Sequence, residues 1–138
     1  MTYDYFEHTA DIGVAARGAT FEQALAQAAV GMFNLIADLS TVREMHSRHI
    51  AVTSTDRETL VVDWLNELLF HYEAHDFLPV AYSVKVAPEG ASLTAECRGE
   101  SADSQRHRLR PAVKAATYHG LSVRQDRREW QIRVVLDI

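Results

Sequence analysis

The sequence predicts an α+β fold of two layers, in which a mainly antiparallel β-sheet carries two long helices packed on one face. Two stretches space their apolar residues as an amphipathic helix does, one starting at Thr20 and a longer one starting at Thr55. Most other segments alternate polar and apolar residues, and short turns join several of them, which favours antiparallel pairing. With 138 residues the chain is expected to form a single domain over residues 1–138.

Three strands are expected in the first part of the chain. Residues 3–7 mix aromatic and charged side chains at alternating positions, and residues 13–17 follow after a polar turn. A third strand over residues 48–53 places Ile50 and Val52 on its inward face. The sequence does not give the order of these strands in the sheet.

Both helices begin at a recognisable capping signal. The Thr20 hydroxyl faces the amide of Gln23, whose own side chain can reach back, and this helix is expected to run to about Ala37. A second capping box, Thr55 with Glu58, opens the longer helix. Its apolar stripe is wide enough to dock on a sheet and contains Val61, Trp64, Leu65, Leu68, Leu69 and Tyr72.

Another face of the longer helix combines acidic and amide side chains with one aromatic residue. It comprises Asp63, Asn66, Glu67 and Phe70. An exposed Phe among acids is unusual, so this face is a candidate partner-binding surface, and a solvated face with a half-covered aromatic is the alternative.

Two hairpins follow. Residues 80–86 and 91–97 alternate cleanly on either side of a Pro-Glu-Gly turn, which predicts a hairpin with one buried face. Residues 121–123 and 130–138 are expected to form the last hairpin. One parity of its second strand is expected to face the core: Trp130, Ile132, Val134, Leu136 and Ile138.

A short helix is expected between the two hairpins, from Pro111 to His119, ended by Gly120. Such a helix would place Lys114 and Tyr118 on one face and project a cation, a phenol and an imidazole from one small element. The preceding polar stretch ends in a basic cluster, which is either a phosphate site or a solvated charge run: Arg106, His107, Arg108 and Arg110.

Composition excludes several classes of protein. Nineteen acidic and 14 basic residues give a net charge of -5, which disfavours strong direct binding to nucleic acid. No apolar run is long enough to span a membrane, and the N-terminus lacks a signal-peptide pattern, so a cytoplasmic protein is expected. Cys97 is the single cysteine, which excludes an internal disulfide and fits a reducing compartment.

Two places in the sequence suggest ligand chemistry. In the turn from His8 to Gly13, Asp11 and His8 could hold a ligand or cation, although an Asx-type turn is the simpler reading. Asp137 precedes the carboxylate of Ile138. Two negative charges so close repel each other unless a cation or a basic side chain neutralises them. Oxygen ligands of this kind favour Ca²⁺ or Mg²⁺, and a frayed strand end is the alternative.

Four stretches, in this order along the chain, resemble the archease family. They are YFEHTADIG at residues 5–13, DWLNELL at 63–69, KAATYH at 114–119 and VLDI at 135–138. Archeases are small cytosolic proteins that assist the GTP-dependent RNA-splicing (tRNA) ligase of the RtcB type. The resemblance therefore implies a non-catalytic activator that promotes guanylylation of the ligase and lets it turn over.

The resemblance also implies a site. A divalent cation, with Ca²⁺ expected and Mg²⁺ or Mn²⁺ as alternatives, would be held by Asp11, Asp137 and the terminal Ile138. Lys114 would lie beside it as a functional residue. The neighbouring partner or functional candidates are His8, Tyr118 and His119.

Two other functions stay open on the residues alone. A small metal-dependent hydrolase would use the cation to activate water, with His8 or His119 as general base, and would turn over a substrate by itself. A chaperone-like binding module would instead use exposed apolar surface such as Phe70.

Overall fold

The structure is a computed structural model that describes residues 1–8, 11–110 and 113–138, without the side chains of residues 7 and 8. Within this part the elements follow one another as β1 (Thr2–His8), β2 (Asp11–Gly18), α1 (Phe21–Ile36), a 3₁₀ turn η1 (Leu39–Thr41), β3 (His46–Thr53), α2 (Arg57–His75), β4 (Phe77–Val86), β5 (Ser92–Ser101), β6 (Ala115–Gln125) and β7 (Trp130–Asp137). No helix of the described residues is long and apolar enough to cross a membrane.

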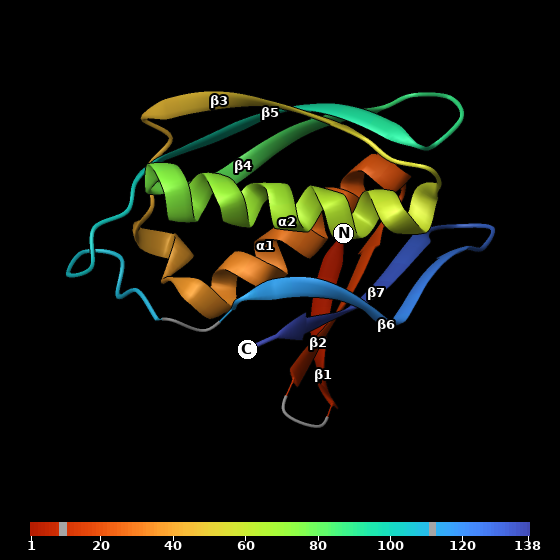
Figure 1. The fold of residues 1–138 in the computed structure, drawn as a ribbon, viewed down its shortest axis with the longest axis horizontal. Helices are drawn as coiled ribbons and strands as arrows, with labels where there is room; N and C mark the ends of the chain where they lie inside the picture. The colour runs from red at the N-terminus through yellow and green to blue at the C-terminus, as the bar shows by residue number, and fades with distance from the viewer. Residues whose placement is uncertain (9–10, 111–112) are drawn as a thin grey trace.

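The described strands form two antiparallel sheets with the helices between them (Figure 1). The larger sheet has the order β1-β2-β7-β6, and the smaller has the order β3-β5-β4. Helix α1 packs on β2 and β4, and α2 packs on β6 and β3, so each helix touches both sheets. The predicted α+β class and antiparallel pairing are confirmed, and the helices cover one face of each sheet, but the strands make two sheets where one was expected.

The second sheet is explained by α2, which is apolar on more than one side. The predicted stripe is buried apart from Tyr72, and the helix also buries Leu60 and Val62. A helix with apolar residues around most of its circumference needs cover on two sides. The Trp64 ring is fully buried, and its indole N–H donates to the Leu25 carbonyl of α1 at 3.0 Å.

The cap of α1 is confirmed, and the cap of α2 lies one residue later than predicted. The Thr20 hydroxyl accepts from the Gln23 amide at 3.1 Å. At α2 the cap is Asp56 and not Thr55, because the Asp56 carboxylate accepts from the Thr59 amide at 2.7 Å. Both residue types cap helices, and a carboxylate also interacts favourably with the positive end of the helix dipole.

Both predicted hairpins are present, and β4, β5 and β6 are longer than the alternation indicated. The β4–β5 pair joins Phe77–Val86 to Ser92–Ser101, and the β6–β7 pair joins Ala115–Gln125 to Trp130–Asp137. Ile138, predicted to face the core, lies beyond the last strand and is 46% exposed. The inward parity ends at Leu136 because β7 ends at Asp137.

The short helix predicted from Pro111 to His119 is wrong in its described part. Residues 115–119 belong to β6, and Lys114 lies in a bend before it, while Pro111 lies outside the described residues. Lys114 and Tyr118 therefore do not share a helical face. Thr117 and Tyr118 favour an extended backbone, and pairing with β7 outweighs the helix propensity of the two alanines at 115 and 116.

Candidate functional site

Asp137 lies where three distant segments of the chain meet. In the β2–β7 ladder it is directly opposite Asp11, and in the β6–β7 ladder it is opposite Ala115. The carbonyl of Asp137 also accepts a hydrogen bond from the Lys114 amide at 2.7 Å. The structure therefore brings together Asp11, Asp137 and Lys114, which the sequence places far apart.

The two carboxylates lie on the outer face of the larger sheet. Residues directly opposite each other on paired strands project to the same face, so Asp11 and Asp137 share one. The residues of the other parity in β7, Ile132, Val134 and Leu136, are fully buried toward the helices. The Asp137 side chain therefore faces away from the core, and solvent or a ligand can reach it.

Gly13 and Phe6 shape the surface beside the two acids. A Cβ at Gly13 would collide with the Phe6 ring, so only glycine fits beneath that ring. Gly13 has no positive φ, which leaves close approach as the reason for glycine at this position. The Arg133 guanidinium lies 4.1 Å from the centre of the same ring and places a fixed positive charge four residues along β7 from Asp137.

Lys114 lies at the same end of the larger sheet, and its side chain lines a cavity. The cavity has a volume of about 550 Å³ and is bounded by Ile36, Tyr72, Glu73, Leu109, Arg110, Val113 and Lys114. Within the described residues the Lys114 ammonium forms no ion pair and no hydrogen bond. An exposed lysine without such a partner is available to a phosphate or a carboxylate from another molecule.

Asn66 of α2 fixes the start of β6 and thereby the position of Lys114. Its side-chain oxygen accepts from the Ala116 amide at 2.8 Å, and its side-chain nitrogen donates to the Ala116 carbonyl at 3.2 Å. Asn66 therefore serves the fold, whereas the sequence placed it in a candidate partner surface. The sequence carries no local signal that separates Asn66 from the other polar residues of this helix.

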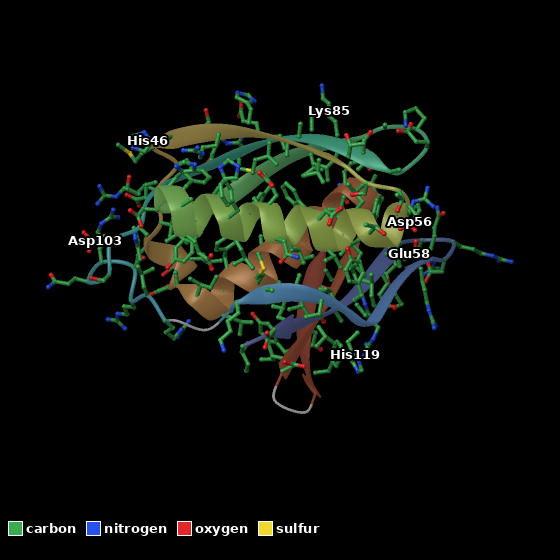
Figure 2. The ribbon with its side chains drawn as sticks, viewed as in Figure 1. His46, Asp56, Glu58, Lys85, Asp103 and His119 are labelled. Carbon is green, nitrogen blue, oxygen red and sulfur yellow. The ribbon has the colours of Figure 1, made fainter. Side chains whose placement is uncertain are left out.

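The other predicted functional residues lie on β1 and β6, the two edge strands of the larger sheet. His8 pairs with Asp11 through the β1–β2 ladder, but its side chain lies outside the described residues, as do Thr9 and Ala10 of the predicted turn. Tyr118 is 58% exposed, and His119 lies on the side of β6 away from the helices (Figure 2).

Tyr118 and His119 occupy an irregular part of β6. The register with β7 shifts between Thr117 and Ser122, and Gly120 has a φ of +65°. The extra residues of such a bulge change the directions in which neighbouring side chains project. Neither aromatic side chain is therefore held in the regular alternation of the strand.

The segment that leads to Lys114 is held by a buried ionic cluster that the sequence analysis missed. Glu100 is 6% exposed and accepts hydrogen bonds from the Arg106 guanidinium and, at 2.6 Å, from the Arg43 amide. The fully buried His107 contacts the same carboxylate at 3.1 Å. The Arg106 guanidinium is the main reason that the pKa of Glu100 lies well below its ordinary value.

The basic cluster at residues 106–110 thus has structural partners within the chain. Arg106 binds Glu100, and Arg110 donates to the carbonyls of Asn34 and Leu35 at 2.9 and 3.1 Å, which closes the C-terminal end of α1. His107 also accepts from the Asp103 amide through Nδ1 at 2.9 Å. The sequence carries no local signal for this cluster, because Glu100 lies in a strand that also contains Glu96 and Arg98.

No group of three or more His, Cys, Asp and Glu side chains that could hold a metal ion occurs in the described part of the chain. The half-buried His71 of α2 is engaged with other side chains. His71 accepts from Arg48 through Nδ1 at 3.0 Å and contacts Glu67 at 3.2 Å. Its pKa is lowered, chiefly by burial and then by the Arg48 charge.

Comparison with known proteins supports one family. The model of the Archease protein family (MTH1598/TM1083) matches residues 3–138. Protein archease of Methanosarcina mazei is 37% identical over 139 residues, which cover 99% of this chain and 95% of that protein. Protein archease of Sulfurisphaera tokodaii is 32% identical over 136 residues, covering 99% and 98% of the two chains.

A solved structure is similar over nearly the whole length. The solution structure of Methanobacterium thermoautotrophicum protein 1598 superposes with a TM-score of 0.84 and 32% sequence identity. The alignment covers 99% of this chain and 98% of that chain. The arrangement of two helices and antiparallel sheets is therefore shared with a protein solved by experiment.

Proposed function

The chain belongs to the archease family, and from that premise we propose that it is an accessory protein that activates an RNA-splicing ligase of the RtcB type. In this role it has no catalytic activity of its own, and it promotes guanylylation and repeated turnover of the GTP-dependent ligase. The observation that carries the proposal is the register of β7, which places Asp137 between Asp11 and the segment that begins β6.

We propose a divalent-cation site at Asp11 and Asp137, with a backbone oxygen of Ile138 as a further ligand. The two carboxylates come from directly paired residues on one face of the sheet, and oxygen donors suit Ca²⁺, with Mg²⁺ or Mn²⁺ as alternatives. Two side-chain carboxylates leave coordination positions for water or a phosphate oxygen. A cation bound there would supply positive charge to a triphosphate.

Lys114 is the proposed second contributor of positive charge. Its ammonium is exposed, and the hydrogen bond from its amide to Asp137 ties its position to the carboxylate pair. Guanylylation develops negative charge on phosphate oxygens, which a correctly placed cation stabilises. We propose that Lys114 contacts the nucleotide phosphates or a ligase carboxylate during this step.

Single-turnover guanylylation of a purified ligase with labelled GTP tests this role. Lys114→Ala is expected to leave ligase binding intact and to slow guanylylation at least about tenfold, since one positioned charge contact contributes roughly 10² to 10³ in rate. Lys85→Ala is the matched control, because Lys85 is an exposed lysine on the other sheet and points away from the helices (Figure 2). A wild-type rate of guanylylation with slower RNA sealing would contradict the proposed step.

Turnover by the protein alone distinguishes the alternative class. A metal-dependent hydrolase would process a substrate without any ligase present, whereas an activator changes only the rate of its ligase. RNA ligation with and without this protein, and incubation of this protein with nucleotides alone, separate the two. Hydrolysis by the isolated protein that Asp11→Ala abolishes would replace the activator proposal.

A further inference from the structure

The two open sheets have four edge strands in the described part of the chain: β1 and β6 in the larger sheet, and β3 and β4 in the smaller. An unprotected edge offers backbone N–H and C=O groups to another chain, so proteins normally block their edges. The four edges here differ in how they are blocked.

Side chains block both edges of the larger sheet. On β1 the Asp4 carboxylate accepts from the Tyr5 amide at 2.8 Å, which occupies a backbone donor of the edge strand. On β6 the Asn66 side chain binds both backbone groups of Ala116, and the strand then loses its regular register. Neither edge presents an uninterrupted row of backbone groups.

The β4 edge of the smaller sheet is blocked in a different way. Pro79 has no amide hydrogen, and the register shifts between Pro79 and Ala81. Lys85 adds a charge further along the strand, where its side chain is exposed. Proline, a bulge and lysine are common means of preventing strand addition.

The second half of β3, from Ile50 to Thr53, lacks all of these features. It contains no charge, no proline and no register shift against β5. Within the described residues, the backbone of this half forms no hydrogen bond outside its ladder with β5. Alternate backbone groups of an edge strand point away from its partner, so this half of β3 offers a free edge.

A groove lies beside this free edge, between β3 and α2, which run next to each other in Figure 1. Its volume is about 460 Å³, and its walls are Ala51, Val52, Thr53, Asp63, Asn66, Glu67 and Phe70. Phe70 is 54% exposed, and the charged side chains in the lining, Asp63 and Glu67, are both acidic. The nearest cation on β3, Arg48, is engaged with His71 at 3.0 Å.

We propose that this groove binds an extended, basic segment of a partner protein, which adds to β3 as a further strand. The free backbone groups of Ile50–Thr53 would supply main-chain hydrogen bonds, as in other cases of strand addition. Side chains of the added strand that face α2 would meet the two carboxylates and the Phe70 ring. Lysine or arginine next to an apolar residue fits that sequence of contacts.

A second copy of this chain fits the groove less well than a basic partner. Pairing of two β3 strands would bring together two grooves that each carry Asp63 and Glu67, and like charges at an interface disfavour association. The net charge of -5 acts in the same direction. This surface is on the smaller sheet, apart from the carboxylate pair on the larger one.

A designed peptide tests the proposal in the absence of any ligase. The probe is a short peptide with blocked ends, in which every second residue is threonine and the residues between are lysine or valine. A second peptide carries glutamate at each lysine position. Binding is followed by amide NMR and hydrogen exchange. The lysine peptide is expected to shift and slow the exchange of amides in Ile50–Thr53, and the glutamate peptide is expected to leave them unchanged.

Two charge reversals provide the matched comparison. Glu67→Lys is expected to weaken binding of the lysine peptide at least about fivefold, whereas Glu129→Lys, in the β6–β7 turn of the larger sheet, changes net charge equally and should leave it unaffected. Phe70→Ser, at an exposed position, should also weaken it. The proposal would be overturned if the lysine peptide did not bind, if it bound away from β3, or if the two charge reversals had equal effects. Self-association of the protein that Phe70→Ser abolishes would also overturn it.

Discussion

Asn66 binds both backbone groups of Ala116, and so joins the middle of α2 to the edge strand β6 at 2.8 and 3.2 Å. The contact replaces the neighbouring strand that the edge lacks. It also lies two residues from Lys114, whose amide binds Asp137. The Asn66 side chain therefore helps to fix the position of Lys114 at the start of β6.

Replacing Asn66 by leucine is expected to destabilise the protein by about 2 kcal/mol or more. Two hydrogen bonds are lost, and the part-buried amide and carbonyl of Ala116 lose their partners. Urea unfolding measures the change in the free energy of unfolding. Glu73→Leu, at an exposed position of the same helix, is the control and should have little effect.

Gly13→Ala is expected to destabilise the fold by roughly 1–3 kcal/mol, because the new methyl group overlaps the Phe6 ring. The second substitution Phe6→Ala should remove most of this cost, although it loses the contact with Arg133. Thermal unfolding of the two single variants and the double variant gives the coupling between the positions. Additive effects would show that the collision with Phe6 is not the cause.

The ionic cluster predicts a loss of stability in acid. Because the pKa of Glu100 is lowered in the folded protein from its ordinary value of 4.5, the folded state binds fewer protons than the unfolded state. The contribution of Glu100 is therefore fully present above that value and is lost as the pH falls below it. The free energy of unfolding, measured in urea from neutral to acid pH, should decline less steeply for Glu100→Gln than for the wild type. Glu89→Gln should behave like the wild type.

Cys97 is expected to be unreactive in the folded protein. It is fully buried on β5, and burial is the main cause that raises the pKa of its thiol to about 12. The thiolate is the reactive form, so alkylation by iodoacetamide at neutral pH should proceed only through unfolding. Labelling with and without urea, followed by mass spectrometry, measures the ratio of the two rates. Equally fast labelling without urea would contradict the buried position.

The proposed cation site predicts a specific loss of calcium binding. Removing one of two carboxylates that share a site removes a charged ligand, so Asp11→Ala should weaken Ca²⁺ binding at least about tenfold in calorimetry. Asp126→Ala is the control, since Asp126 lies in the exposed β6–β7 turn and makes local hydrogen bonds there. Unchanged binding in Asp11→Ala would exclude this carboxylate as a ligand.

Local signals in the sequence predicted most of the elements. Thr20 and the spacing of the apolar residues after it define α1, and alternation defines the β4–β5 hairpin. These signals act over a few residues and need no knowledge of the rest of the chain. The cap of α2 was predicted at Thr55 and lies at Asp56, because adjacent residues of both types can cap a helix.

What the sequence could not provide depends on contacts between distant residues. The alanines of β6 favour a helix locally, and only β7 and Asn66 hold them in a strand. The cluster of Glu100 with Arg106 requires a loop to fold back on a strand end. The pairing of Asp11 with Asp137 was foreseen through family resemblance and not from the spacing of the residues.

The position of β7 has a consequence for how the molecule forms during synthesis. It is the last of the described strands in chain order, yet it lies inside its sheet between β2 and β6. A nascent chain would carry β2 with one side unpaired until residues 130–137 have left the ribosome. Contacts of such high sequence separation slow folding and expose intermediates to aggregation. The carboxylate pair therefore cannot form until β7 has been synthesised and has paired with β2.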